Sequence, residues 1–139
     1  MPIVLGYDES PGALRALRVA IEVSANYGEP LVLVFGAAVP GGRGEEYRTH
    51  REALHQAGRV ALEHAVTAAE AAGVPTLVEI IDQKPAQALI DAATRHEARL
   101  IVVGTWGESP MRGALLGSTP HKLLHLSHFP VLCVPTEEE

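Results

Sequence analysis

Cysteine and aromatic residues are scarce in this chain of 139 residues. Cys133 is the only cysteine, so neither an intrachain disulfide nor a thiolate-rich metal site can form. Aromatic residues make up 4% of the chain, whereas 47% of it is hydrophobic. A core of closely layered Ala, Val and Leu suits an α/β domain, and the length predicts a single domain over residues 1–139.

Cationic residues are also few. The chain has 11 Lys and Arg residues and 17 Asp and Glu residues, which gives a formal net charge of −6. This balance argues against nucleic acid and anionic membranes as partners, because a phosphate-rich surface needs a basic face. No segment approaches the roughly 20 apolar residues that cross a bilayer, and the start has no basic region typical of a signal peptide. We therefore expect a cytoplasmic protein.

Short, nearly continuous β-branched runs are typical of parallel strands buried on both faces. Patterns with helical period separate these runs, and strict alternation of strands and helices predicts a parallel sheet with helices on both faces. Ligands of such sheets bind beyond the carboxyl ends of the strands, where the strand order switches. The expected strands are residues 3–7, 31–35, 76–81, 100–104 and 131–134.

Glycine and proline mark the expected helix ends. Gly28 stands at the end of the first helix, Gly73 ends a long second helix over residues 45–72, and Pro85 and Pro120 lie in the first turns of the last two helices. The first helix carries one face of Leu14, Leu17, Ile21 and Ser24, and the last carries Leu123, Leu124 and Ser127. In the second helix a face of mostly small residues can lie close to the sheet, namely Leu54, Ala57, Ala61, Ala65, Val66 and Ala69.

The most informative stretch runs from Gly104 to Pro120. Gly104 closes a buried strand, and Gly117-Ser118-Thr119 opens a helix, which puts a glycine-bordered loop at the mouth of the sheet. Glycine permits positive φ and close approach of the backbone to a ligand. The first turn of a helix offers unpaired N–H groups and the positive end of the dipole, so phosphate is the natural occupant.

These residues resemble a known family. Gly104-x2-Gly107-x9-Gly117-Ser118 resembles the nucleotide signature of the universal stress protein family, and segments 6–10 and 130–134 resemble its opening and closing motifs. The resemblance implies a five-stranded sheet of order 3-2-1-4-5 and ATP at the switch point, for which we expect accompanying Mg²⁺. It also implies a homodimer joined through the fifth strand, Val131, Leu132, Cys133 and Val134.

The resemblance also assigns roles to individual residues. Asp8 would meet the ribose or adenine, and the backbone at Gly36 and Ala37 would read the adenine edge, since Gly36 has no side chain to block the base. Glu108 stands where relatives often carry Arg or another polar residue, and an acid beside a triphosphate costs affinity unless a cation bridges them. The phosphate residues would be Gly104, Thr105, Gly107, Arg112, Gly117, Ser118 and Thr119.

Plainer interpretations accompany these assignments. Asp8 could cap the first helix, although Ser10 is the better N-cap, and Arg112 could be a solvated loop residue rather than a phosphate ligand. His121 and His125 have the spacing of a metal-binding pair, but no Cys or carboxylate accompanies them in sequence, and we expect no metal site. An exposed face of the long helix explains His50, His55 and His64.

Catalysis is not expected. Lys84 and Lys122 are the only lysines, so a P-loop lysine is missing, and no catalytic residues can be assigned. Bound ATP would be a regulatory ligand or a very slow substrate. One alternative is a phospho-acceptor receiver domain with Asp8, Glu9, Asp82 and Thr105 around Mg²⁺, although Pro135 stands where that class needs lysine. Another is a dimeric adaptor that has lost its nucleotide.

Overall fold

Strands and helices alternate along the chain, as the sequence predicts. The computed structural model describes residues 1–39, 41–105 and 117–136. Within those ranges the elements are β1 (Ile3–Gly6), α1 (Pro11–Tyr27), β2 (Leu31–Gly36), α2 (Gly44–Ala71), β3 (Thr76–Ile81), α3 (Pro85–His96), β4 (Leu100–Gly104), α4 (Ser118–Leu126) and β5 (Val131–Val134).

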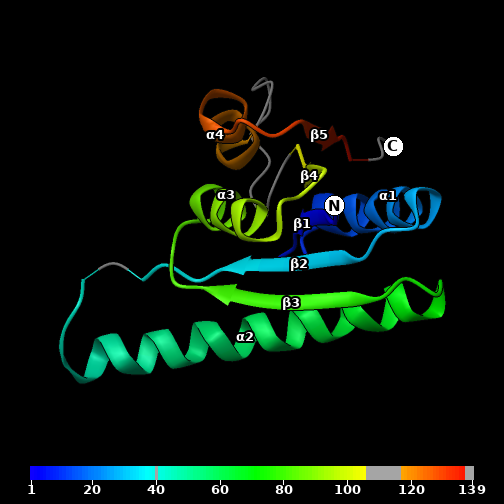
Figure 1. The fold of residues 1–139 in the computed structure, drawn as a ribbon. Coiled ribbons are helices and arrows are strands. Elements are labelled where there is room, and N and C mark those ends of the chain that lie inside the picture. Colours follow the sequence, from blue (N-terminus) through cyan, green and yellow to red (C-terminus); the bar gives the residue numbers. More distant parts are fainter. Residues whose placement is uncertain (40, 106–116, 137–139) are drawn as a thin grey trace.

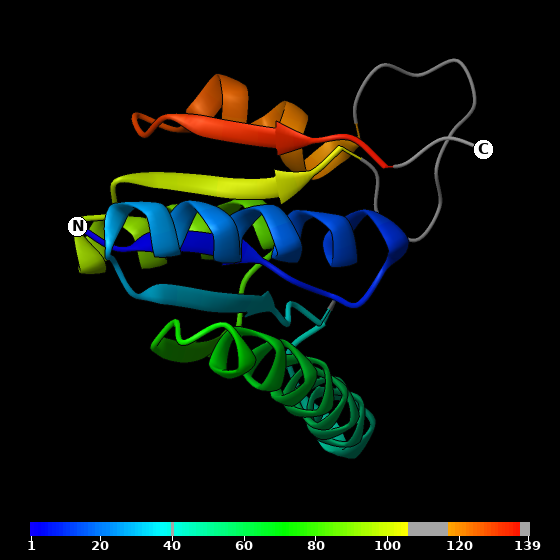
Figure 2. The same cartoon turned by 90° about the vertical axis from the view of Figure 1, so that its right-hand side faces the viewer.

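The sheet is parallel, and its order β3-β2-β1-β4-β5 confirms the predicted topology. The central strand β1 pairs with β2 on one side and with β4 on the other, so that Ile3 lies between Leu31 and Leu100. Helices α1 and α2 cover one face, and α3 and α4 cover the other (Figures 1 and 2). The strand order therefore switches between β1 and β4.

Two aliphatic layers form the core, one on each face of the sheet. Alternate strand residues divide between them: Ile3 and Leu5 pack with α1 and α2, whereas Val4 and Ile101 pack with α3 and α4. Burial of each such side chain contributes about 1.5–3 kcal/mol. Small residues on the helices allow close contact with the sheet, namely Ala16, Ala20, Ala61, Ala65, Ala88 and Ala92, all nearly or fully buried.

Glycine and proline end and begin the helices as predicted. Gly28 caps α1 with φ of 67°, Gly73 follows α2 with φ of 74°, and Pro85 begins α3. The N-cap of α1 is Ser10, whose hydroxyl accepts from the Ala13 N–H. None of the helices within the described ranges has both the length and the apolar character to cross a bilayer.

Some burial predictions are wrong. Leu77 and Val78 of β3 are 48% and 47% exposed, because β3 is an edge strand and lacks a neighbour on one side. Leu14 is 47% exposed, since α1 faces the sheet through Ala13, Ala16, Leu17 and Ala20 instead. Leu124 of α4 is also exposed, which leaves Leu123 as the buried leucine there.

Candidate functional site

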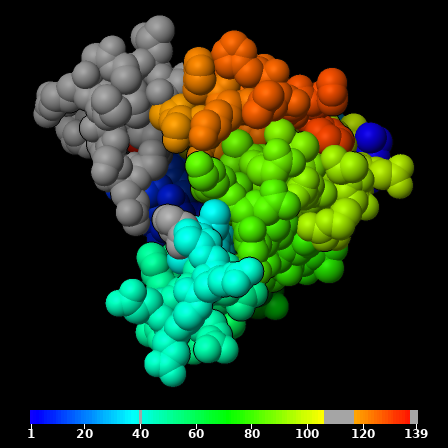
Figure 3. Space-filling view, turned by 90° about the vertical axis from the view of Figure 1, so that its left-hand side faces the viewer, coloured from blue at the N-terminus to red at the C-terminus, as the bar shows by residue number. Residues whose placement is uncertain are grey.

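A cavity of about 650 Å³ opens at the carboxyl ends of the strands. It lies at the switch between β1 and β4, and α1 and α4, the helices next in order after these strands, pack on opposite faces of the sheet. In the space-filling view, residues from the start of the chain form the floor of a hollow next to α3 and the segment that leads into α2 (Figure 3). The volume suits a nucleotide-sized ligand.

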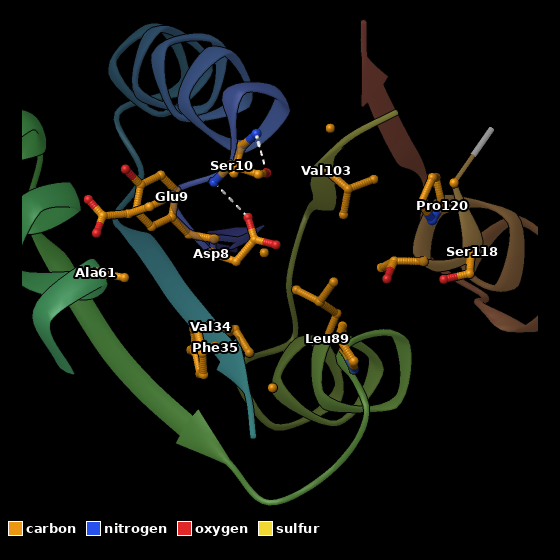
Figure 4. A pocket seen from close by; sticks show the side chains of 18 of the residues that line it. Asp8, Glu9, Ser10, Val34, Phe35, Ala61, Leu89, Val103, Ser118 and Pro120 are labelled. Atoms are coloured by element: carbon orange, nitrogen blue, oxygen red, sulfur yellow. Dashed lines mark hydrogen bonds between the residues drawn. The ribbon is translucent and has the colours of Figure 1, made fainter. Parts of the chain in front are cut away.

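The cavity has an apolar side and a polar side. Phe35, Leu54 and Ala61 line it from β2 and α2, while Ser118 and Thr119 line it from the start of α4. Figure 4 shows Asp8 between these two walls. The remaining lining residues are Gly6, Tyr7, Glu9, Ser10, Ala13, Val34, Gly36, Ala57, Pro85, Leu89, Val103, Gly104, Gly117 and Pro120.

Asp8 has its side chain in the cavity and does not cap α1. Its Oδ1 accepts from the Ser10 N–H at 3.0 Å, and Ser10 itself provides the N-cap. This hydrogen bond fixes the carboxylate, while the other carboxylate oxygen lies toward the cavity (Figure 4). Asp8 can therefore accept a hydrogen bond from a ligand hydroxyl.

Glu9 is a lining residue that the sequence interpretation did not assign to the nucleotide site. Its φ is 64°, a left-handed conformation uncommon for a residue other than glycine. The Glu9 Oε2 lies 2.5 Å from Nδ1 of His64 on α2. This hydrogen bond and the charge of Glu9 raise the pKa of His64. The interpretation of His64 as merely exposed missed this pair, because no sequence pattern connects residues so far apart.

Tyr7 is almost fully buried beneath the same loop. Burial, with smaller contributions from the negative charges of Glu9 and Asp8, raises the pKa of Tyr7 to about 12. Its hydroxyl therefore stays protonated at neutral pH.

The glycines of the site serve packing rather than positive φ. A Cβ on Gly104 would lie 2.8 Å from the carbonyl of Gly12, so glycine lets β4 lie directly on α1. A Cβ on Gly36 would lie 2.8 Å from Pro85 Cα, so glycine there permits contact with the start of α3. Gly117 is the N-cap of α4, with φ of −69°.

The structure brings together six of the ten predicted site residues, namely Asp8, Gly36, Gly104, Gly117, Ser118 and Thr119. Ala37 lies outside the lining, and its N–H donates to Ile81 O at 2.8 Å. Thr105 also lies outside the lining, but its carbonyl accepts from the Gly117 N–H at 2.7 Å and so positions the start of α4. Gly107, Arg112 and Glu108 fall outside the described residues.

The carboxylates required by the receiver alternative do not meet. Asp82 turns to α2, where it pairs with Arg51 at 2.6 Å and His55 at 2.5 Å, and it does not line the cavity. These hydrogen bonds, the one from Arg51 foremost, lower the pKa of Asp82. Over residues 1–39, 41–105 and 117–136, no group of three His, Cys, Asp or Glu residues is placed to hold a metal ion. The described residues thus do not form the acidic cluster that this alternative requires.

The sheet and its cavity define a doubly wound α/β protein with a cavity at the switch point, where such folds bind their ligands. The model of the universal stress protein family matches residues 1–135. The chain belongs to this family.

Relatives resemble this chain over nearly its whole length. A universal stress protein of Thermus aquaticus is 34% identical over 134 residues, which are 95% of this chain and 96% of that one. A universal stress protein solved in complex with cAMP is 28% identical, with a TM-score of 0.78 over 99% of this chain and 98% of that one. The Archaeoglobus fulgidus protein solved with dAMP, 24% identical with a TM-score of 0.68 over 96% and 97%, shows the same fold.

Proposed function

We propose that this protein binds an adenine nucleotide in the cavity at the switch point and acts as a dimeric regulatory or protective module of a stress response. The cavity itself carries the proposal. Its volume suits a nucleotide, its apolar wall suits a base, and the start of α4 suits phosphate. The relative in complex with cAMP supports this ligand class.

The walls suggest how a nucleotide would lie. The base would pack against Phe35 and Ala61, and the ribose hydroxyls would donate to Asp8. Phosphate would lie at the first turn of α4, where Ser118 and Thr119 add hydroxyl donors and the helix dipole favours negative charge. Of the two residues proposed to read the adenine edge, Gly36 lines the cavity and Ala37 does not. The Ala37 N–H already donates to Ile81 O.

ATP with Mg²⁺ is the specific ligand that we propose. The phosphate-binding segment would extend over Thr105, Gly107 and Arg112. Two acids, Asp8 and Glu9, line the described cavity, so a divalent cation on the phosphates would offset the repulsion. Hydrolysis would be very slow at most, because the chain offers no P-loop lysine.

The ligand can be identified directly. Denaturing the purified protein should release an adenine nucleotide that chromatography detects, and calorimetry should show ATP binding in the presence of Mg²⁺. Gly117→Val should abolish binding, because a β-branched side chain at the start of α4 would fill the space that the phosphate needs. Gly42→Val is the matched control, since Gly42 is exposed and has no neighbour within 4 Å of an added Cβ. Equal affinity of the Gly117→Val variant and the parent would contradict the site.

Dimerisation through β5 is the second part of the proposal. This strand is the last in the sheet order, and its Leu132 is 38% exposed. Pairing of the segment Val131–Val134 with its two-fold mate would cover that edge. Light scattering should give a dimer for the parent and a monomer for Leu132→Lys. Leu77→Lys, on the opposite edge, should leave the dimer intact; an unchanged dimer in Leu132→Lys would contradict the interface.

A further inference from the structure

The cavity wall carries two adjacent acids. Asp8 and Glu9 both line it, and no Lys or Arg is among the lining residues that the structure describes. Their side chains diverge: Asp8 extends into the cavity, whereas Glu9 extends toward α2 (Figure 4). Glu9 thus places a negative charge at the wall, apart from the carboxylate proposed to meet the sugar.

The left-handed backbone and His64 together hold Glu9 in this position. With φ of 64°, Glu9 turns its side chain out of the Asp8–Ser10 loop, and its Oε2 lies 2.5 Å from Nδ1 of His64. Glu63, next to His64 on α2, also raises the pKa of His64, and on the cavity side Glu9 and Asp8 both act on Tyr7. A protonated His64 therefore offsets part of a negative field whose other sources are carboxylates.

We propose that Glu9 is a specificity-determining residue that disfavours nucleotides in proportion to their negative charge, and that His64 limits this effect by compensating the carboxylate. The inference rests on nucleotide binding in this cavity. Like charges repel, so each additional phosphate charge on the ligand increases the penalty. The sugar and base of the ligand do not change it.

The negative charge of Glu9 also acts on the buried hydroxyl of Tyr7. The charge of Glu9 contributes, after burial, to the raised pKa of Tyr7, and it contributes ahead of Asp8. The carboxylate of Glu9 thus acts electrostatically on a cavity-lining residue although its side chain extends toward α2. A phosphate in the same cavity would experience the same sign of potential.

A ligand series separated by charge tests the proposal. Calorimetry would compare adenosine, cAMP, AMP, ADP and ATP without divalent cations, at mildly acidic pH, which together with the raised pKa of His64 favours its protonated form. Glu9→Gln should leave adenosine unchanged, tighten cAMP about two- to fivefold and tighten ATP about tenfold. His64→Gln should act in the opposite direction, weakening ATP most. A merely structural pair would lose affinity in both variants, by the same factor for every ligand.

Control variants isolate the position of the charge. Glu70→Gln removes a carboxylate from an exposed position on α2 outside the cavity and should change no affinity in the series. Glu9→Gly removes the same charge with a residue that suits the left-handed backbone, and it replaces Glu9→Gln if that variant fails to fold. If the parent binds the series but Glu9→Gln changes every affinity equally or none, the charge selection is wrong and nucleotide binding stands. If the parent binds none of the ligands, both proposals fail.

Discussion

The two ends of the same sheet differ in how the chain closes them. At the amino ends of the strands, backbone hydrogen bonds join neighbouring connections, as in Ile3 N–H to Pro30 O and Arg99 N–H to Pro2 O. The Arg99 guanidinium lies 4.2 Å from the centre of the Tyr27 ring, and it also pairs with Glu29. At the carboxyl ends, α1 and α4, the helices next in order after β1 and β4, lie on opposite faces of the sheet, and the cavity opens there.

This difference separates stability from binding. The amino end is fastened by backbone bonds and an ion pair that take no part in the cavity, so substitutions there should alter stability alone. At the carboxyl end the close contacts that hold the elements also form the cavity walls, so substitutions there should alter stability and affinity together. Variants at the two ends can test that contrast.

Gly104→Ala should have the largest effect. The added Cβ would lie 2.8 Å from the Gly12 carbonyl, and backbone cannot move aside as a side chain can. We expect about 2–3 kcal/mol less stability in urea denaturation, together with loss of nucleotide affinity. Gly42→Ala, where an added Cβ meets nothing within 4 Å, should match the parent. Parental stability of the Gly104→Ala variant would contradict the close packing of β4 on α1.

Gly58→Ala should act mainly on affinity. Gly58 lies in α2, and its added Cβ would fall 2.7 Å from Cδ1 of Phe35, whose ring lines the cavity. Alanine gains about 1 kcal/mol of helix propensity, which offsets part of the clash, so stability should change little. The displaced ring should reduce nucleotide affinity about tenfold in calorimetry. An unchanged affinity would show that the position of Phe35 does not shape the site.

Arg99→Ala should test the amino end. It removes the contact with the Tyr27 ring and the ion pair with Glu29, which together stabilise the fold by about 1 kcal/mol. Urea denaturation should show this loss, while calorimetry should give the parental nucleotide affinity. A change in affinity would break the proposed separation between the two ends.

Acid should produce the smallest effect, at Asp82. Its pKa is lowered by hydrogen bonds from Arg51 and then His55, so the stabilising pairs are present above the unfolded pKa and are lost as pH falls through the folded pKa. The group is 46% exposed, so solvent screens the pairs and the contribution is modest. Below about pH 4, the melting temperature should fall less steeply with decreasing pH for Asp82→Asn than for the parent. Glu70→Gln should keep the parental profile.

The sequence predicted the fold well because local signals coincide with it. The apolar runs match the strands, and Gly28 and Pro85 stand where helices end and begin. Exposure of Leu77 was not predictable from its own segment, because burial on both faces depends on having a strand neighbour on each side.

The candidate site was predicted in part. Asp8 and Gly117 follow from motif spacing, and both line the cavity. The pairing of Glu9 with His64 depends on how α2 crosses the sheet, which no local pattern encodes. Gly104 and Gly36 were expected at the site for a ligand's sake, and the sequence did not show that packing against Gly12 and Pro85 also requires glycine there.

The central position of β1 has a consequence for how the chain folds. Ile3 finds one partner at Leu31, early in the chain, and the other at Leu100, near its end. The β1–β2–β3 half can assemble while the ribosome is still translating the rest, but one side of β1 stays unpaired until β4 emerges. Closing that long loop gives the domain a high contact order, so docking of β4 on β1 should limit the folding rate.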